Sequence, residues 1–228
     1  MYSCQDYLER FPLDSPADEN FLSNEAELET AVTSCYNILW FKPIDNGSFA
    51  LTLECASDIG WDRNGGDLQS LGMGNATPDN GYTGGFWNTF YRGIGRCNYI
   101  LAKAGPLAET VPEEKYNRLL AEVRFLRAYY YFYLNELFGG VPLLTEPVPL
   151  EEAQIPRASK SDLTDFILSE LDAAFPALPG QTDNANKGRV TQGAVLALKS
   201  RVALYNERWD VAAQAAGELM ETGNYGLH

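Results

Sequence analysis

Histidine is almost absent from this 228-residue chain, because the single one, His228, is the last residue. A Ser–His or Cys–His pair for nucleophilic catalysis therefore has no plausible internal histidine, and histidine-ligated zinc fails for the same reason. The glycines of the stretch RNGGDLQSLGMGN neither follow a strand pattern nor match a phosphate-binding loop. The sequence thus predicts no catalytic residue, no metal site and no cofactor.

Positive charge and long apolar runs are also scarce. Lys and Arg number 17 against 31 Asp and Glu, so the net charge is −14 and the pI is near 4.4. Nucleic acids and anionic membrane surfaces are bound by clustered Lys and Arg, whereas here Arg118, Arg124 and Arg127 stand singly. There is no run of 18 or more apolar residues to span a bilayer. We therefore expect no nucleic-acid partner and no membrane-spanning segment.

The four cysteines form no CxxC pair and no metal-ligand spacing. Cys35 and Cys97 fall on the apolar stripes of predicted helices and are expected to be small buried side chains. Cys4 follows Ser3 near the N-terminus, where a lipid-modified bacterial cysteine would stand after signal cleavage, although an ordinary terminal thiol fits the same residues. If Cys4 carries lipid, three thiols remain, and an odd number excludes a fully paired disulfide framework.

Helical periodicity covers most of the chain and predicts a mainly α fold. Single helices are expected over 23–41, ending before Pro43, and over 86–105, 112–138 and 159–175, and a pair of helices joined by a tight turn is expected over 190–223. That pair has 34 residues, the period of a tetratricopeptide repeat, which favours a scaffold of stacked helical pairs.

The segment 60–85 interrupts this pattern, since eight of its 26 residues are glycine, interleaved with Asp, Asn and Thr. Such composition predicts a long irregular loop, and a loop of this length in a compact protein is usually functional or mobile.

One predicted helix is aromatic on every side, because Tyr129, Tyr130, Tyr131, Phe132 and Tyr133 occur in a row. In stacked helical pairs a central helix touches neighbours on several sides and can be aromatic all round. We therefore predict that this run meets other parts of the protein and not a ligand or a membrane.

Four stretches, in order along the chain, carry a family resemblance. The stretch LLAEVRFLRAYYYFYLNELFGGVPLLTEP closely resembles the signature of the SusD/RagB family, the surface glycan-binding lipoproteins of Bacteroidetes. The other three resemble the mature N-terminus of that family, its next helix and its repeat-bearing segment: SCQDYLERFPLDSPADENFLSNEAELETAVTSCYNIL, FWNTFYRGIGRCNYIL and GRVTQGAVLALKSRVALYNERWDVAAQAAGELMETGNYGLH. The resemblance covers nearly the whole chain, as a single SusD-like N-terminal region over residues 1–228.

This resemblance implies several properties. The family fold is a scaffold of tetratricopeptide-like helical pairs that supports a loop-rich portion with the ligand site. Its members are not enzymes. They are held at the outer-membrane surface by a lipidated N-terminal cysteine, which Cys4 matches, and they capture oligosaccharides for import by a SusC-like TonB-dependent transporter. Family members are considerably longer, so we expect the C-terminal half, which usually supplies part of the ligand site, to be absent from this chain.

Candidate ligand contacts lie in the Gly-rich segment, since sugar binding needs an aromatic ring beside polar groups. Trp61 could hold the face of a sugar ring, and the competing interpretation is a tryptophan that pins the long loop to the scaffold. Tyr82 is a weaker candidate from the same segment. Trp40 and Phe41 lie at a predicted helix end and could belong either to a rim or to the core. Trp87 and Trp209 fall on helical stripes and are assigned to packing. The predicted ligand-binding residues are Trp61, Asp62, Asn64, Asp67 and Tyr82.

Other readings of the same residues stay open. Asp58, Asp62 and Asp67 could be glycosidase carboxylates or ligands of an irregular calcium site, but the loop does not match a D-x-D-x-D-G pattern with its closing Glu. The captured ligand could be a peptide instead of a sugar. From another class, the chain could be a helical-repeat scaffold that binds a protein segment, with a purely structural loop.

Overall fold

The computed structural model describes residues 21–40 and 49–226; Cys4 and Phe41 lie outside them. Within these residues the chain forms eight α-helices and no strand. The helices are α1 (Glu25–Tyr36), α2 (Phe49–Cys55), α3 (Asp67–Gly72), α4 (Gly81–Lys103), α5 (Glu113–Phe138), α6 (Lys160–Ala174), α7 (Gln192–Tyr205) and α8 (Trp209–Glu221). Short 3-10 turns are η2 (Asn37–Leu39), η3 (Gly105–Glu109), η4 (Leu150–Glu152) and η5 (Phe175–Ala177).

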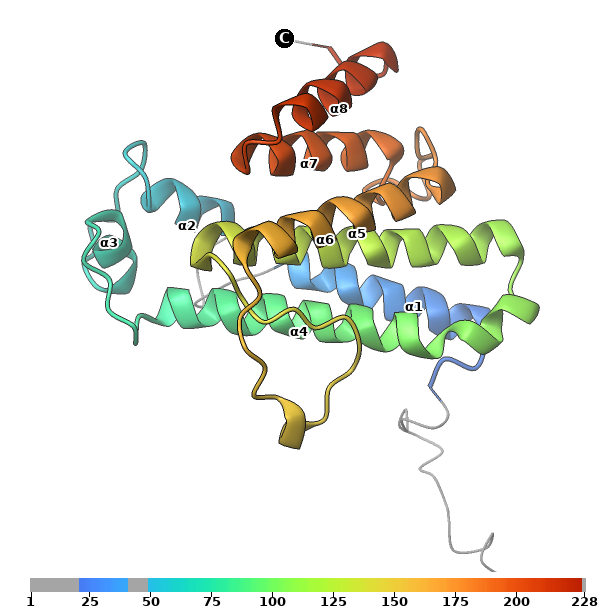
Figure 1. The fold of residues 1–228 in the computed structure, drawn as a ribbon, viewed down its shortest axis with the longest axis horizontal. Helices are drawn as coiled ribbons and strands as arrows, with labels where there is room; N and C mark the ends of the chain where they lie inside the picture. Colours follow the sequence, from blue (N-terminus) through green and yellow to red (C-terminus); the bar gives the residue numbers. More distant parts are fainter. Residues whose placement is uncertain (1–20, 41–48, 227–228) are drawn as a thin grey trace, which may run out of the picture.

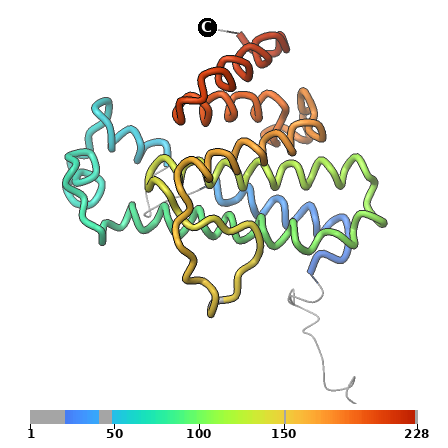
Figure 2. The backbone as a smooth tube through the Cα atoms, in the orientation of Figure 1, coloured from blue at the N-terminus to red at the C-terminus, as the bar shows by residue number. Residues whose placement is uncertain are grey.

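The helices are stacked in layers around α5 (Figure 1). Helices α1 and α4 pack against one side of α5, and α6 packs along its other side. Helix α7 follows on α6, and α8 lies on α7 as the outermost layer. The tube in Figure 2 shows the short helices α2 and α3 to one side of this stack, at the start of α4. The predicted mainly α scaffold of tetratricopeptide-like helical pairs is confirmed.

Side-chain caps explain why most predicted helices begin where they do. Asn24 accepts a hydrogen bond from the Glu27 amide at 3.0 Å, and Ser159 accepts one from the Asp162 amide at 3.0 Å. The reversal between α7 and α8 uses Glu207, whose φ of 59° lies in the left-handed region, at the predicted tight turn.

The prediction of one irregular loop over 60–85 was wrong in two places, because α3 lies within it and α4 begins at Gly81. The short helix α2 was also missed. Two glycines let these parts approach closely: a Cβ at Gly60 would lie 2.6 Å from the Glu54 carbonyl oxygen, and one at Gly72 would lie 2.4 Å from that of Cys55. Gly60 and Gly72 therefore serve packing, which composition alone did not distinguish from loop flexibility.

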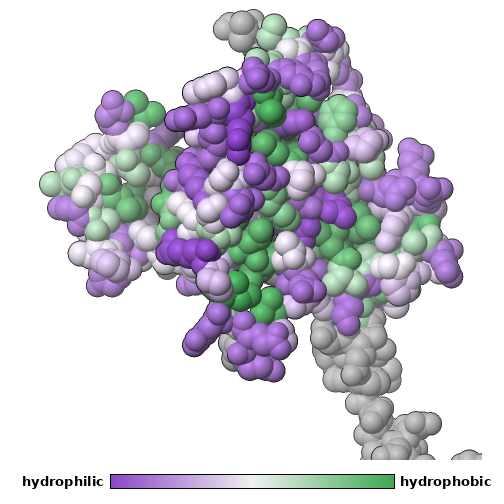
Figure 3. Space-filling model, viewed as in Figure 1, coloured by the Kyte–Doolittle hydropathy of each residue, from purple (hydrophilic) through white to green (hydrophobic). Residues whose placement is uncertain are grey.

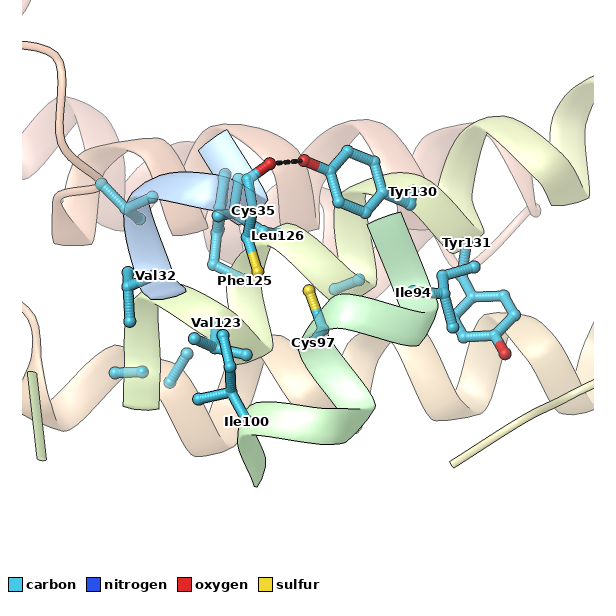
Figure 4. Close-up of a cluster of buried hydrophobic side chains, with 14 of the residues drawn as sticks. Val32, Cys35, Ile94, Cys97, Ile100, Val123, Phe125, Leu126, Tyr130 and Tyr131 are labelled. Carbon is cyan, nitrogen blue, oxygen red and sulfur yellow. Dashed lines mark hydrogen bonds between the residues drawn. The ribbon is translucent and has the colours of Figure 1, made fainter. Parts of the chain in front are cut away.

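The tyrosine run packs against protein, as predicted. Tyr130 and Tyr131 are fully buried and Phe132 is 2% exposed, while Tyr129 and Tyr133 pack at the edge of the core. The Tyr130 hydroxyl donates to the Cys35 carbonyl at 2.7 Å, which ties α5 to α1 (Figure 4).

Cys35 and Cys97 are completely buried free thiols, in agreement with the sequence prediction. Their side chains point toward one another between α1 and α4 (Figure 4). Burial and the neighbouring Cys35 thiol raise the pKa of Cys97 well above its ordinary value. These thiols therefore behave as small apolar side chains of the core.

Two buried glutamates hold the middle of α5 in place. Glu122 accepts hydrogen bonds from Arg118 at 2.8 Å, from Arg189 at 2.6 Å and from the Tyr36 hydroxyl at 2.9 Å. The second is Glu170 of α6, which is 4% exposed and pairs with the guanidinium groups of Arg124 and Arg127. A buried carboxylate is tolerated only when such partners surround it, so these clusters specify how α1, α5, α6 and the segment before α7 fit together.

The extended segment after α5, residues 141–149, is held by side chains of the helices beneath it. The Tyr131 hydroxyl donates to the Leu144 carbonyl at 2.9 Å and accepts from the Leu144 amide at 2.7 Å. Asn98 donates to the carbonyls of Leu144 and Glu146, and Arg127 donates to that of Thr145. Buried polar groups of α4 and α5 thus satisfy backbone groups that a neighbouring strand would otherwise serve.

The tryptophans divide differently from the prediction. Trp87 is half-buried and makes an edge contact with Phe138 at a centroid distance of 5.2 Å, which confirms its packing role. Trp40 is 80% exposed and therefore lies at the surface and not in the core. The packing assignment of Trp209 was wrong, because α8 lies outermost and this ring is 60% exposed.

On the face shown in Figure 3, hydrophobic and hydrophilic residues are intermixed.

Candidate functional site

The candidate site lies at the end of the stack where α2, the following loop, α3 and the start of α4 meet. Trp61 stands on the loop between α2 and α3 and is 62% exposed. Because Gly60 packs against the Glu54 carbonyl, the backbone just before Trp61 is held close to α2. An indole presented in this way is accessible to a flat ligand and contributes little to the core, which counts against the reading of Trp61 as a loop anchor.

The loop after Trp61 is closed by local hydrogen bonds. The Asp62 carboxylate accepts from the Asn64 amide at 3.1 Å, and the Asp62 carbonyl accepts from the Gln69 side chain at 3.2 Å. Gly65 and Gly66 then adopt φ values of 78° and 82°, which turn the chain into α3. Asp62 is half-buried in this turn, whereas Asn64 is exposed at its tip.

Asp67 joins the start of α3 to the start of α4. Its carboxylate accepts from the Gly81 amide at 2.7 Å, and its carbonyl accepts from the Asn80 side chain at 2.8 Å. Asn80 in turn caps α4 by accepting from the amides of Tyr82 and Thr83 at 3.0 and 3.2 Å. Asp67 therefore has a structural role besides any contact with a ligand.

Asn80 was missed by the sequence reasoning. It is 3% exposed and it joins the start of α3 to the start of α4. The available signal was an Asn two residues after Pro78 and directly before a helical pattern. The glycines at 81, 84 and 85 obscured this signal, because they were interpreted as loop residues.

Tyr82 lies beside both carboxylates. It is half-buried and packs against the core. Burial raises the pKa of the Tyr82 hydroxyl above its usual value, and the negative charges of Asp62 and Asp67 raise it further. The structure therefore gathers Asp62, Asp67 and Tyr82 together, with Trp61 and Asn64 exposed on the adjoining loop.

Among the residues that the structure describes, there is no group of three or more His, Cys, Asp or Glu side chains placed to hold a metal ion. In the same part of the chain, no helix is both long and apolar enough to cross a bilayer.

Two surface hollows lie away from Trp61. One of about 720 Å³ opens between α5 and η5 and is lined by Arg118, Arg124, Leu178 and their neighbours. The other, of about 470 Å³, lies beside the turn between α7 and α8, where Tyr205 and Arg208 face α6 residues. Both are open and of mixed polarity.

Comparison with known proteins identifies the family of this chain. Residues 6–204 match the profile of a protein family described as starch-binding and associating with the outer membrane. A SusD-like protein of Formosa agariphila is 25% identical over 99% of this chain and 45% of its own length.

Solved structures agree. A SusD-like carbohydrate-binding protein of Bacteroides fragilis matches 92% of this chain and 42% of its own, at 30% identity and a TM-score of 0.84. A laminarin-binding SusD-like protein matches 86% of this chain and 43% of its own, at 29% identity and a TM-score of 0.78. The chain thus spans less than half the length of these relatives. The chain belongs to the SusD/RagB family.

Proposed function

We propose that this chain captures oligosaccharides at the outer-membrane surface through the surface that surrounds Trp61. The observation that carries the proposal is the 62% exposure of the Trp61 indole on a loop held by the Asp62, Asp67 and Asn80 hydrogen bonds. Sugar rings present an apolar face that packs on an indole, while their hydroxyls bond to nearby carboxylates and amides. Membership of a family described as starch-binding supports this chemistry.

The proposal assigns different roles to the predicted contacts. Trp61 supplies the stacking surface, and Asp62 and Asn64 follow it within three residues along the loop. Asp67 acts chiefly by holding α3 to α4, and Tyr82 contributes its half-buried edge. The ligand then meets one open aromatic ring and a set of polar groups beneath it. We assign no catalytic step to these residues.

The wider setting follows from the family and is part of the same proposal. Lipid attached to Cys4 would hold the protein to the outer membrane, and a SusC-like TonB-dependent transporter would receive the captured oligosaccharide for import. Such an assembly takes up nutrients and performs no hydrolysis.

The test is calorimetric titration with laminarin oligosaccharides, followed by a panel of plant, host and microbial glycans. We expect saturable binding that Trp61→Ala weakens by at least about tenfold, as truncation of an aromatic anchor does. Trp209→Ala is the matched control, since that indole is also exposed, at 60%, but stands on α8. Equal binding by the native protein and Trp61→Ala would remove Trp61 from the site.

A second candidate function is a scaffold for a peptide segment, favoured by the hollow between α5 and η5. Arg118 and Arg124 line this hollow together with the apolar side chains of Leu120 and Leu178. Ala173→Trp, an exposed position in its wall, should abolish binding of a peptide there and leave binding of sugars at Trp61 unchanged. If peptides bind the native protein and Ala173→Trp equally, this candidate is wrong.

A further inference from the structure

The acidic residues near Trp61 bear on which glycans the surface proposed above would admit, an inference that rests on the proposed function. Between Phe49 and Tyr91 the sequence holds five acidic residues and one basic residue, Arg63. The acidic residues are Glu54, Asp58, Asp62, Asp67 and Asp79. This segment of less than a fifth of the chain therefore carries a local excess of four negative charges, out of a net charge of −14 for the whole chain.

The structure leaves these charges without cationic partners. Every ion pair among the described residues lies elsewhere, in α1, α5, α6, α7, the segment 187–191 or the turn before α8. The carboxylates of Asp62 and Asp67 accept hydrogen bonds from the neutral backbone amides of Asn64 and Gly81, which do not cancel a full charge. Glu54, Asp58 and Asp79 are exposed to solvent.

Three of these acidic residues lie close to Trp61. Asp62 is its neighbour in sequence, and Asp58 is three residues away, a separation that a chain can extend to about 11 Å at most. Glu54 is near in space, since its carbonyl packs against Gly60. A separation of this size is close to the distance over which physiological salt screens a charge, about 8 Å.

We infer that the Trp61 surface takes uncharged oligosaccharides and rejects glycans that carry uronate or sulfate groups. Hydroxyl groups of a neutral sugar can donate hydrogen bonds to carboxylates, and the apolar face of its ring can pack on the indole. A uronate or sulfate group brings a negative charge that needs Arg or Lys beside it, and Arg63 is the one such residue in this segment.

The experiment compares laminarihexaose, which is neutral, with an oligogalacturonate of the same length, which carries a carboxylate on every sugar. Titrations are run by calorimetry at low and high NaCl. We expect laminarihexaose to bind with an affinity that salt does not change, and the oligogalacturonate to bind at least about tenfold more weakly at low salt, where repulsion is least screened.

Glu54→Lys tests the cause of this selectivity. This exposed residue near the end of α2 lies outside the proposed contacts, so its replacement should raise oligogalacturonate affinity at low salt by about fivefold or more and leave laminarihexaose binding unchanged. Glu221→Lys makes the same change of charge at the exposed end of α8 and should alter neither affinity.

The outcomes separate this inference from the function it rests on. Tighter binding of the oligogalacturonate than of laminarihexaose, lost in Trp61→Ala, would overturn the inference and keep the site. Equal effects of Glu54→Lys and Glu221→Lys would also overturn it, because only net charge would then matter. If neither sugar binds the native protein, or if both bind the native protein and Trp61→Ala with the same affinity, the proposed function itself is wrong.

Discussion

At the scale of single residues, two glycines of α4 show how closely this helix approaches α5. A Cβ at Gly93 would lie 2.7 Å from the Tyr130 ring and 3.2 Å from Ile38, whereas one at Gly95 would meet nothing within 4 Å. We expect Gly93→Ala to lower the free energy of unfolding by about 1–3 kcal/mol through overpacking. Gly95→Ala, the matched control, should raise it by up to about 1 kcal/mol, because Ala favours the helix. Denaturant unfolding measures both, and a neutral Gly93→Ala would show that Tyr130 can move aside.

Residue-level predictions from the sequence succeeded where a side chain is constrained by periodicity. Cys35, Cys97 and the tyrosine run fall on repeating apolar positions, and all are buried or packed at the core. The packing assignment of Trp209 was wrong and the role of Trp61 stayed open, because their exposure depends on which element lies opposite, and the sequence does not name that neighbour. Whether Trp61 touches a ligand stays a prediction.

At the scale of elements, the junction of α5 and α6 depends on one buried ion pair. Arg127 is 4% exposed and pairs with Glu170 at 2.6 Å, while it also donates to Asn98 and to the Thr145 carbonyl. We expect Arg127→Met to lower the free energy of unfolding by about 3–5 kcal/mol, because Glu170 stays buried with only Arg124 beside it.

The control for this element is the exposed pair of Arg208 and Asp165, which joins the turn before α8 to α6 at 3.1 Å. Arg208→Met should cost less than about 1 kcal/mol, as exposed ion pairs do. Urea denaturation of both variants checks the contrast. Similar losses for the two would indicate that solvent reaches the Arg127 pair.

Helix starts were predictable where cap residues precede a periodic run, as at Ser23 or Asn24 before α1 and Ser159 before α6. They were not predictable in the Gly-rich segment. There the helices α2 and α3 are seven and six residues long, too short for periodicity to show. Their positions depend on contacts between Gly60, Gly72 and α2, which are distant enough in sequence to leave no local pattern.

At the scale of the whole molecule, burial of many tyrosines makes the fold sensitive to alkali. Burial is the largest cause that raises the pKa values of five phenols: Tyr36, Tyr91, Tyr129, Tyr130 and Tyr131. Above about pH 10 the unfolded chain releases these protons while the native protein keeps them. The unfolded state then binds fewer protons, so stability is fully present below about pH 10 and falls as the pH rises further.

This prediction is checked by recording tyrosinate absorbance and circular dichroism together during an alkaline titration. We expect a fraction of the 13 tyrosines to ionise only as helicity is lost, in one cooperative step. In denaturant all of them should ionise together near pH 10. Complete ionisation of the native protein before any loss of helicity would contradict the burial of these side chains.

The fold as a whole was the most predictable level, since helical periodicity and the ordered family stretches agree over nearly the whole chain. The candidate site was the least predictable. Its composition pointed to the right segment, but the links from Asp67 to Gly81 and from Asn80 to α3 join residues 13 or 14 positions apart through hydrogen bonds of a loop. Such contacts follow from the assembled structure and have no periodic signature.

The layered order of the helices also sets how the molecule opens. Helix α5 has neighbours on several sides, whereas α8 packs chiefly on α7 and is joined to α6 through Arg208. Local opening requires fewer contacts to break at the outer layer than at the centre. Backbone amides should therefore exchange with deuterium fastest in α8, more slowly in α7 and α6, and slowest in α5, so that the order of the layers is the order of protection.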